Sequence, residues 1–487
     1  MILNALQRSL SYLLGAVILF STSAGAADER PNILLILADD LGYADVGFNG
    51  SSDITTPSLD ELANEGVTFS QAYVAHAFCG PSRAGLMTGR YPHKFGSQFN
   101  LPDIYMSGGV GVPESEVFVS DVLQDSNYFT GAIGKWHLGE TDKYHPNNRG
   151  FDEFYGFLNG GHNYFPEDFN RRYDALRAAG RTDIPHYLLP LEHNGQRVRE
   201  TEYITDALSR EAVKFVTDGS KKEQPWFLYL AYNAPHTPLQ AKPEDMAKFP
   251  HIKDKKRKTY AGMVYALDRG VKRVIDTLKE TGQYDNTVVV FLSDNGGKLS
   301  QGANNDPLRA GKGSALEGGF RVPMFVHWPG KIKSNSHYKH PVNALDLFPT
   351  FASLAEAELP QGLELDGENL WPALQTGESA RKGETFFAMR HRGDHSDTAA
   401  IRDQWKAVRV GKEPWALYDV AADPAESKDL SEEKPNLLHD LVTDANVWSW
   451  THVQPRWFHI QKEGFLWREE SMPRFHETFD LLEGKSY

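Results

Sequence analysis

The chain has 487 residues, of which 40% are hydrophobic and 24% charged, a composition typical of a globular protein. Its 65 acidic residues outnumber 51 basic ones, and the formal net charge of −14 argues against nucleic acid as a general partner. An anionic small substrate stays open, because a local basic pocket can lie on an acidic protein. The single cysteine excludes an intramolecular disulfide bond.

The first 26 residues have the three-part layout of a bacterial secretory signal. Arg8 precedes an apolar run over residues 10–20, and the small residues of STSAGA follow it. The run is too short to span a bilayer comfortably, and no later run is long enough. We therefore expect cleavage near Ala26 and a periplasmic or secreted protein with no stable membrane anchor.

Strand and helix patterns alternate through the first two thirds of the chain. Apolar runs over residues 32–38, 129–133, 225–232, 286–297 and 322–329 predict buried strands. Helical spacing and end signals predict helices over residues 57–66, 120–125, 204–216 and 260–278. This alternation indicates an α/β fold with a large, mostly parallel mixed sheet between layers of helices.

The pattern changes after about residue 375. Residues 384–390, 398–410 and 414–420 have the character of antiparallel strands, and residues 434–447 predict a closing helix. We expect three parts: a signal peptide over residues 1–26, a catalytic domain over residues 27–375, and a smaller C-terminal α+β domain over residues 376–487. The tryptophan-rich tail from residue 448 has no predicted place.

Acidic and amide side chains stand at the ends of two predicted strands. Asp39 and Asp40 follow the first strand, and Asp294 and Asn295 end a later one. In parallel sheets, ligands bind at the carboxyl ends of the strands. If the two strands are neighbours, a hard divalent cation would relieve the repulsion among three carboxylates. Either pair alone is more often a helix cap or a turn, but the two together indicate a metal site.

Basic and imidazole side chains lie on successive loops. GKWHLG carries Lys135 and His137, NAPHTP carries His236 just after a strand, and GKGSALEGG carries Lys312. Each alone is usually an ordinary loop residue. Beside a metal, two lysines and two histidines suggest an anionic ester substrate, whose charge the lysines would hold and whose protons the histidines would move.

The stretch around the lone cysteine, CGPSRAGLMTGR over residues 79–90, resembles the signature of the type I, formylglycine-dependent sulfatases. The motifs ADDLG, GKWHLG, NAPHTP, SDNGG and GKGSALEGGFRVP are also similar to that family, in the expected order, over about residues 30–350. The resemblance implies an alkaline-phosphatase-like fold and a sulfuric ester hydrolase. It also implies a maturase partner that oxidises Cys79 to formylglycine.

The same resemblance implies a role for each matching residue. Arg83 would hold the hydrated residue 79 while it attacks sulfur. Lys135 and Lys312 would bind the sulfate oxygens, His236 would protonate the leaving alcohol, and His137 would take the proton from the second hydroxyl. Four side chains would join modified Cys79 as ligands of one calcium ion (Ca2+), with Mg2+ less expected: Asp39, Asp40, Asp294 and Asn295.

The sulfated sugar is less sharply indicated. The region from residue 134 to 165 is similar to galactosamine-4-sulfatase-like members of the family, which favours a 4-sulfate on a galacto-configured sugar, as in carrageenan. Glycosaminoglycans and ulvan remain open. Arg321 is also expected to support the site by a salt bridge. The candidate sugar contacts are His162, Asn163, Tyr164, Arg321, His391 and Arg392.

Two other functions fit the same residues. A phosphonate or phosphate-ester hydrolase would share the metal and nucleophile geometry, and relative rates on matched aryl esters separate it from a sulfatase. An inactive sugar-binding protein would bind a glycan without releasing sulfate. The sequence leaves the oligomeric state and the choice between endo and exo action open.

Overall fold

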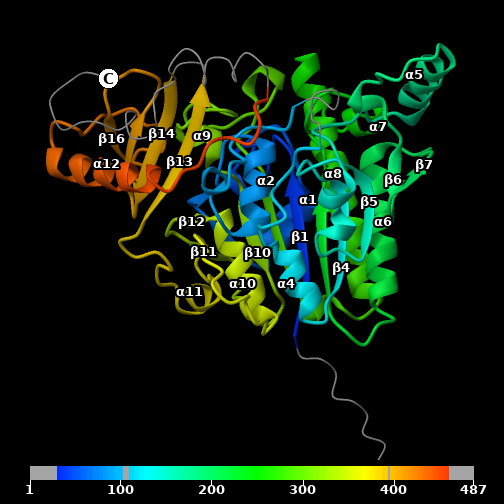
Figure 1. Ribbon diagram of the computed structural model, residues 1–487, viewed down its shortest axis with the longest axis horizontal. Coiled ribbons are helices and arrows are strands. Elements are labelled where there is room, and N and C mark those ends of the chain that lie inside the picture. Colours follow the sequence, from blue (N-terminus) through cyan, green and yellow to red (C-terminus); the bar gives the residue numbers. More distant parts are fainter. Residues whose placement is uncertain (1–29, 103–108, 393–394, 460–487) are drawn as a thin grey trace, which may run out of the picture.

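The buried apolar runs form the middle of a ten-stranded sheet with the order β11-β2-β10-β9-β1-β8-β4-β5-β6-β7 (Figure 1). The structure, a computed structural model, describes residues 30–102, 109–392 and 395–459. The central strands pair in parallel. They are β1 (Asn32–Ala38), β4 (Phe129–Lys135), β5 (Glu153–Phe157), β8 (Trp226–Ala231) and β9 (Thr287–Ser293).

Shorter strands extend both edges of this sheet. On one side, β10 (Met324–His327) runs antiparallel to β9 and to β2 (Val67–Phe69), and β11 (Ser336–Tyr338) runs parallel to β2. On the other side, β6 (Leu191–His193) runs antiparallel to both β5 and β7 (Gln196–Val198). The predicted α/β class with a mostly parallel mixed sheet is therefore confirmed.

Helices cover both faces of the sheet because the side chains of each central strand alternate between the faces. On one face, Leu35 and Leu37 of β1 share a core with α2 (Cys79–Thr88), α4 (Val119–Asp125) and α10 (Leu347–Leu354). On the opposite face, Leu34 and Ile36 share a second core with three other helices (Figure 1). These are α1 (Pro57–Asn64), α6 (Ile204–Gly219) and α8 (Lys255–Glu280).

The register of two central strands positions the acidic residues. β1 and β9 are neighbours, and Ala38 at the end of β1 pairs with Ser293 at the end of β9. The next residues, Asp39 and Asp294, therefore leave the sheet side by side at its carboxyl edge. The expected strand over residues 286–297 is shorter in the structure, since β9 ends at Ser293 and leaves its acid and amide in a loop.

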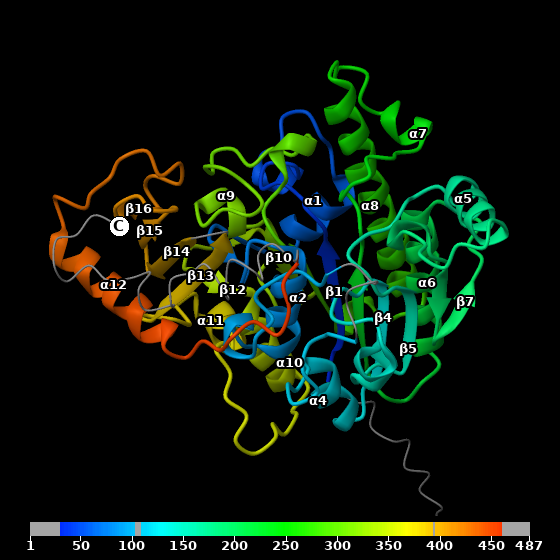
Figure 2. The same cartoon turned by 45° about the horizontal axis from the view of Figure 1, so that its top comes forward.

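A separate four-stranded antiparallel sheet follows in the chain (Figure 2). Its strands are β13 (Thr385–Arg392), β14 (His395–Arg402), β15 (Trp405–Arg409) and β16 (Ala416–Asp419). The helix α12 (Pro435–Ser449) packs on this sheet through Leu441, Val442 and Ala445. The predicted C-terminal strands and closing helix are therefore present.

Some predictions fall on residues that the structure leaves undescribed or on boundaries that it does not test. The expected signal peptide, residues 1–26, lies outside the described residues, so export stays a prediction. The domain boundary near residue 375 also stays a prediction.

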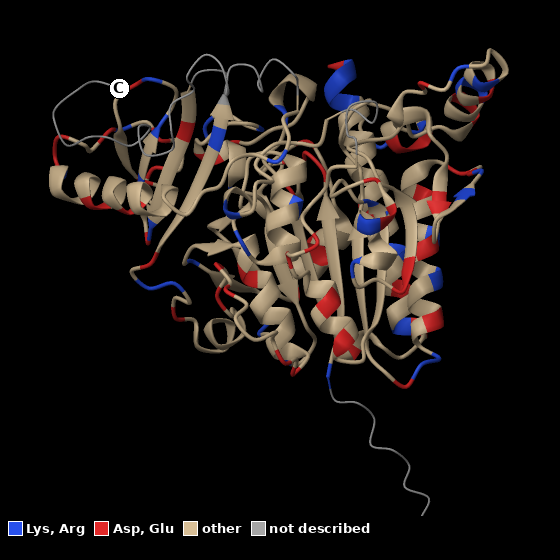
Figure 3. Cartoon of the chain, viewed as in Figure 1, with Lys and Arg blue, Asp and Glu red and all other residues tan. Residues whose placement is uncertain are grey.

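Within the described ranges, no helix has both the length and the apolar character needed to cross a membrane. Acidic and basic residues are interspersed along the helices (Figure 3).

Candidate active site

The predicted acidic residues meet at the carboxyl edge of the sheet. Asp40 donates its backbone N–H to Asp294 Oδ1 at 3.3 Å, and Asp294 donates its own N–H to Ala38 O at 3.0 Å. Asp39, Asp40 and Asp294 are all buried. Asp40 has a φ of 63°, a left-handed conformation that is costly for a residue other than glycine. This backbone conformation occurs where the adjacent carboxylates of Asp39 and Asp40 are brought into one site.

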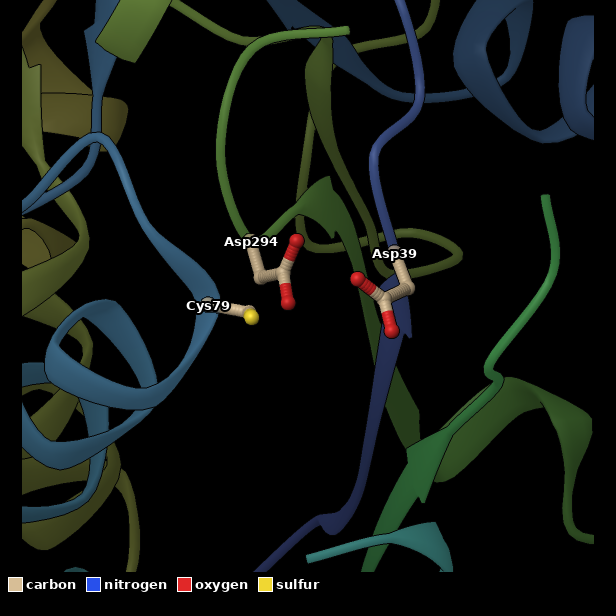
Figure 4. A group of neighbouring side chains, drawn as sticks. All are labelled: Asp39, Cys79 and Asp294. Atoms are coloured by element: carbon tan, nitrogen blue, oxygen red, sulfur yellow. The ribbon is translucent and has the colours of Figure 1, made fainter. Parts of the chain in front are cut away.

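The lone cysteine lies against these acids. Cys79 is the first residue of α2 and is 2% exposed. Single ligand atoms of Asp39, Cys79 and Asp294 lie within 4.8 Å of one another (Figure 4). A second such group consists of Asp39, Asp40 and His236. The motifs that the sequence placed on separate loops therefore converge on one point.

Two oxygens at this point make the donor set suitable for a cation. Asp39 Oδ1 and Asn295 Oδ1 are buried and accept no hydrogen bond. Leaving a buried acceptor unpaired costs about 1–3 kcal/mol, so native proteins rarely retain one without a partner. Carboxylate and amide oxygens are the ligands that hard divalent cations prefer. The residues present therefore fit a divalent metal ion.

Three cationic side chains face the three carboxylates. Arg83 pairs with Asp294 at 2.8 Å, Lys135 Nζ lies 2.6 Å from Asp39 Oδ2, and Lys312 Nζ lies 2.5 Å from Asp40 Oδ1. The repulsion among the carboxylates, from which the sequence predicted a metal, is therefore already offset by the protein's own cations. The unpaired oxygens, rather than uncompensated charge, indicate the metal.

The same balance predicts which ligand the site attracts. Three carboxylates and three cations cancel, so a bound divalent ion would make the cluster net positive. A buried positive cluster favours an anionic ligand because electrostatic interactions are strong where water is excluded. The site is thus suited to a substrate that carries a negative charge.

Both predicted histidines lie in the site. His236 Nε2 is 3.8 Å from Asp40 Oδ2, and His236 Nδ1 donates to Thr237 O at 2.7 Å, which leaves Nε2 to exchange a proton. Burial lowers the pKa of His236 to about 3. Asp40 raises this pKa, whereas Lys312 and Lys135 lower it further. Burial also lowers the pKa of His137 well below its usual value, helped by nearby Lys135.

Most of the predicted sugar contacts are buried and bonded within the protein. The His162 ring lies 2.6 Å from Asn163 O and 2.7 Å from Leu189 O, and Asn163 is also buried. Tyr164 donates its hydroxyl to Asn233 O and His236 O, so it supports the loop that carries His236. Tyr164 therefore supports the site, whereas His162 and Asn163 are buried, and sugar contact by these three residues stays a prediction.

The remaining sugar-contact candidates lie on or near the C-terminal sheet. Arg321 forms the expected salt bridge, with Glu317 Oε2 at 3.0 Å. His391 is buried, with Nδ1 2.6 Å from Ser396 Oγ, and therefore faces the interior of the protein. The backbone of Arg392 is in β13, but its side chain lies outside the described part of the structure.

Two residues that the sequence did not indicate also contact the site. Asn100 Oδ1 lies 3.7 Å from Cys79 Sγ and accepts the N–H of Gly80 at 2.9 Å. Tyr229 OH accepts from Arg83 Nη1 at 3.3 Å. Tyr229 could have been indicated by the alternation of side chains along β8 between the two faces of the sheet. Asn100 lies on an irregular loop, and no pattern in the sequence marks it.

Comparisons with known proteins match most of the chain to one protein family. The family model described as Sulfatase matches residues 31–357, and the one described as N-sulphoglucosamine sulphohydrolase, C-terminal, matches residues 312–444. Arylsulfatase A from Homo sapiens is 34% identical over 441 residues, which cover 88% of this chain and 84% of the relative. The uncharacterized sulfatase YdeN from Escherichia coli (strain K12) is 34% identical over 408 residues, 73% of this chain and 68% of the relative.

A solved structure is also similar along nearly the whole chain. It is the crystal structure of Ps i-CgsB in complex with k-i-k-neocarrahexaose. It superposes with a TM-score of 0.91 at 59% sequence identity and covers 93% of this chain and 100% of the other. The likeness therefore includes the C-terminal sheet as well as the large sheet.

Proposed function

The chain belongs to the sulfatase family and hydrolyses sulfate esters, and from that premise we propose that its substrate is a sulfated carrageenan oligosaccharide. The observation that carries the proposal is the likeness to Ps i-CgsB, whose crystal structure holds k-i-k-neocarrahexaose, at 59% identity over 93% of this chain. Within carrageenan, we propose the 4-sulfate of a galacto-configured unit as the ester that is cleaved.

The proposed catalytic centre has two parts that the polypeptide must acquire. One is a Ca2+ ion held by Asp39, Asp40, Asp294 and Asn295 together with residue 79; when bound, it polarises the sulfate ester as a Lewis acid. The other is formylglycine at position 79, whose hydrate supplies the attacking hydroxyl. Support comes from the unpaired oxygens of Asp39 and Asn295 and from the place of Cys79 beside the acids.

The chain's own cations hold the substrate and the nucleophile in place. Lys135 and Lys312 present ammonium groups beside Asp39 and Asp40, where they can bind sulfate oxygens. Arg83 is fixed by Asp294 and by the carbonyl of Lys135 at 2.8 Å, so its guanidinium can orient residue 79. Residue 79 also stands at the N-terminal end of α2, where the helix dipole favours negative charge.

The two histidines move the protons. His236 protonates the departing alcohol from Nε2, which must first take up a proton because burial keeps the resting ring neutral; Asp40, 3.8 Å away, favours that uptake against the effect of burial. His137 accepts the proton of the second hydroxyl at residue 79, because its buried ring is neutral at rest.

The substrate proposal is tested by sulfate release from defined oligosaccharides. Carrageenan, ulvan and chondroitin oligosaccharides are incubated with the matured enzyme, and free sulfate and the desulfated product are identified. We expect release from carrageenan at the 4-position. Release only from chondroitin or ulvan would overturn the carrageenan assignment while leaving the sulfatase activity intact. Matched aryl sulfate and aryl phosphate esters test the alternative hydrolase chemistry.

The proposed role of residue 79 is tested by Cys79→Ala. We expect loss of sulfate release with an unchanged circular dichroism spectrum, because alanine fills the buried position without providing a nucleophile. Mass spectrometry of the wild-type peptide determines whether the cysteine has been converted. A variant that retains substantial turnover would refute the nucleophile assignment, and one that binds glycan as tightly as the wild type would separate binding from catalysis.

A further inference from the structure

The end of the described chain runs beside the loop that carries Asn100. Residues 453–459, the C-terminal strap, lie along the loop of residues 93–101 that follows α2 (Figures 1 and 2). Val453 donates its N–H to His93 O at 3.0 Å, and Arg456 donates to Gly96 O at 2.9 Å. Gln98 Nε2 returns a hydrogen bond to Val453 O at 3.1 Å. The strap is therefore bonded to this loop along its length.

Two side chains of the strap fix the carbonyls on either side of Asn100. Trp457 Nε1 donates to Phe99 O at 2.9 Å, and this contact is buried. His459 Nδ1 lies 3.2 Å from Leu101 O and must donate, because a carbonyl oxygen only accepts. Phe99, Leu101 and Trp457 also form a small apolar cluster of their own. The backbone of Asn100 is thus held from both sides.

The Asn100 side chain transmits this restraint to residue 79. Its Oδ1 accepts the N–H of Gly80 at 2.9 Å and lies 3.7 Å from Cys79 Sγ. The residue that precedes α2, Phe78, offers no side-chain cap, so Asn100 caps the first turn from a distant loop. A Cβ atom at position 80 would lie 2.9 Å from Asn100 Oδ1 and 3.4 Å from His137 Cε1. Glycine therefore leaves the space that this contact requires.

We propose that Asn100, held by the C-terminal strap, is a positioning residue that fixes the side chain of residue 79 against the acidic cluster. The proposal rests on the proposed nucleophilic role of residue 79. It gives a place and a task to residues 453–459 of the tail that the sequence left unplaced; residues 460–487 lie outside the described residues. A displacement of about 1 Å at a nucleophile can cost about 100-fold in rate, so a restraint on this one side chain is consequential.

The first test uses protein in which Cys79 is unconverted. Because the chain has one cysteine, iodoacetamide labels position 79 alone, and the labelling rate reports how tightly that side chain is held. We expect Asn100→Ala to label about tenfold faster than the wild type, because both the cap and the contact with Sγ are lost. Asn100→Asp retains the accepting oxygen but adds a negative charge that disfavours the reactive thiolate, so it should label no faster than the wild type.

The strap has a matched pair of tryptophans for the same assay. Trp457→Phe keeps an aromatic ring in the apolar cluster but removes the donor to Phe99 O, and we expect labelling to rise severalfold. Trp450, at the end of α12, is 70% exposed, and Trp450→Phe should leave the labelling rate unchanged. If both tryptophan variants label at the wild-type rate, the strap does not act on residue 79 and the proposal is wrong.

The second test measures turnover by matured enzyme. We expect kcat of Asn100→Ala to fall at least tenfold with KM within about twofold, because the nucleophile is misplaced while sulfate binding is retained. An unchanged kcat together with an unchanged labelling rate would overturn the proposal. If no form, wild type included, releases sulfate, the proposed function fails and the labelling rates alone decide the positioning role. Asn100→Asp and Trp457→Phe carry the test if the alanine variant does not fold.

Discussion

At the scale of single residues, charge is balanced in the active site but coordination is incomplete. Six side chains pair as three buried ion pairs: Arg83 with Asp294, Lys135 with Asp39, and Lys312 with Asp40. Buried pairs of this kind add little net stability, because desolvation offsets the attraction. Because these pairs cancel in charge, a bound divalent cation leaves the site net positive and able to attract an anionic ester.

The first prediction concerns metal binding at Asp39. Ca2+ should raise the melting temperature of wild-type protein after chelation, because a ligand bound only by the folded state at 100 times its Kd contributes about 2.7 kcal/mol. Asp39→Asn should reduce this calcium-dependent shift, since it removes the charge of a carboxylate whose Oδ1 is buried and unpaired. Thermal denaturation with and without Ca2+ measures the shift.

The control for this prediction is Asp285→Asn, at an exposed position distant from the cluster. It should retain the full calcium-dependent shift. The two variants are compared only by the difference in melting temperature between samples with Ca2+ and samples with chelator. This is necessary because Asp39→Asn also leaves Lys135 without its partner and lowers the stability without metal. Equal shifts in the two variants would contradict a metal site at Asp39.

The sequence predicted the chemistry of the site better than its supports. Residues in motifs, such as Lys135 and His236, were identifiable because their side-chain types and strand-end positions indicate a reaction. Asn100 was not, because its role depends on a loop held by a strap more than 350 positions later. His391 was expected at the substrate but is buried, since strand alternation turns it inward.

At the scale of elements, the long buried strands were predictable and the short ones were not. β1, β8 and β9 are apolar runs long enough to indicate strands without tertiary information. The two-residue strands β3 (Ala72–Tyr73) and β12 (Val342–Asn343) have no period to detect. The helix α5 (Pro166–Ala178) was missed because it is mostly polar and buries few residues.

The second prediction concerns the segment that enters α6. Glu200 is 4% exposed and accepts hydrogen bonds from Thr201 N, Glu202 N, Tyr155 OH and Arg210 Nη2 of α6. Burial raises its pKa, but the hydrogen bonds from Arg210, Tyr155 and the backbone outweigh burial and lower the pKa to about 2. The charged form is therefore the one that the folded state favours.

Because the folded pKa lies below the unfolded value, this stabilisation is present above about pH 4.3 and is lost as pH falls toward 2. Glu200→Gln should lower the free energy of unfolding by about 2 kcal/mol at pH 7, discounted because Arg210 is partly exposed. The difference from wild type should narrow below pH 4. Urea denaturation at several pH values measures it.

The matched control is Glu202→Gln. Glu202 also pairs with Arg210, at 3.1 Å, but its side chain is 46% exposed. Exposed ion pairs contribute about 0–1 kcal/mol, so the loss should be small and nearly independent of pH. A loss as large as that of Glu200→Gln would show that the Arg210 charge, rather than the buried network, is responsible.

At the scale of the whole molecule, a group of histidines lies where the C-terminal sheet meets the large α/β body. His93 stacks on His452 with ring centroids 4.9 Å apart and lies 5.6 Å from His76 and 5.8 Å from His391. Trp448 of α12 also packs against His93 at 5.4 Å. This histidine cluster therefore joins a loop near the active site to β13, α12 and the residues that follow α12.

Burial in the folded protein favours the uncharged form of these four histidines. Burial lowers the pKa of His76 and His391 to about 3, with Arg390 adding to the effect on His76. Burial lowers the pKa of His93 and His452 well below the usual value, and each is lowered further by a neighbouring histidine. The unfolded chain, in contrast, binds protons at these histidines below about pH 6.5.

The third prediction follows from this difference in proton binding. Since the unfolded state binds more protons below pH 6.5, each cluster histidine should lower the free energy of unfolding by about 1.4 kcal/mol per pH unit below that value. His93→Phe, which keeps a buried ring but cannot take up a proton, should reduce the slope by about that amount between pH 6 and 5. His439→Gln, at an exposed position of α12, should leave the slope unchanged. Denaturant midpoints across this range measure the slope, and a slope in His93→Phe equal to that of wild type would mean that the pKa of His93 is not lowered in the folded protein.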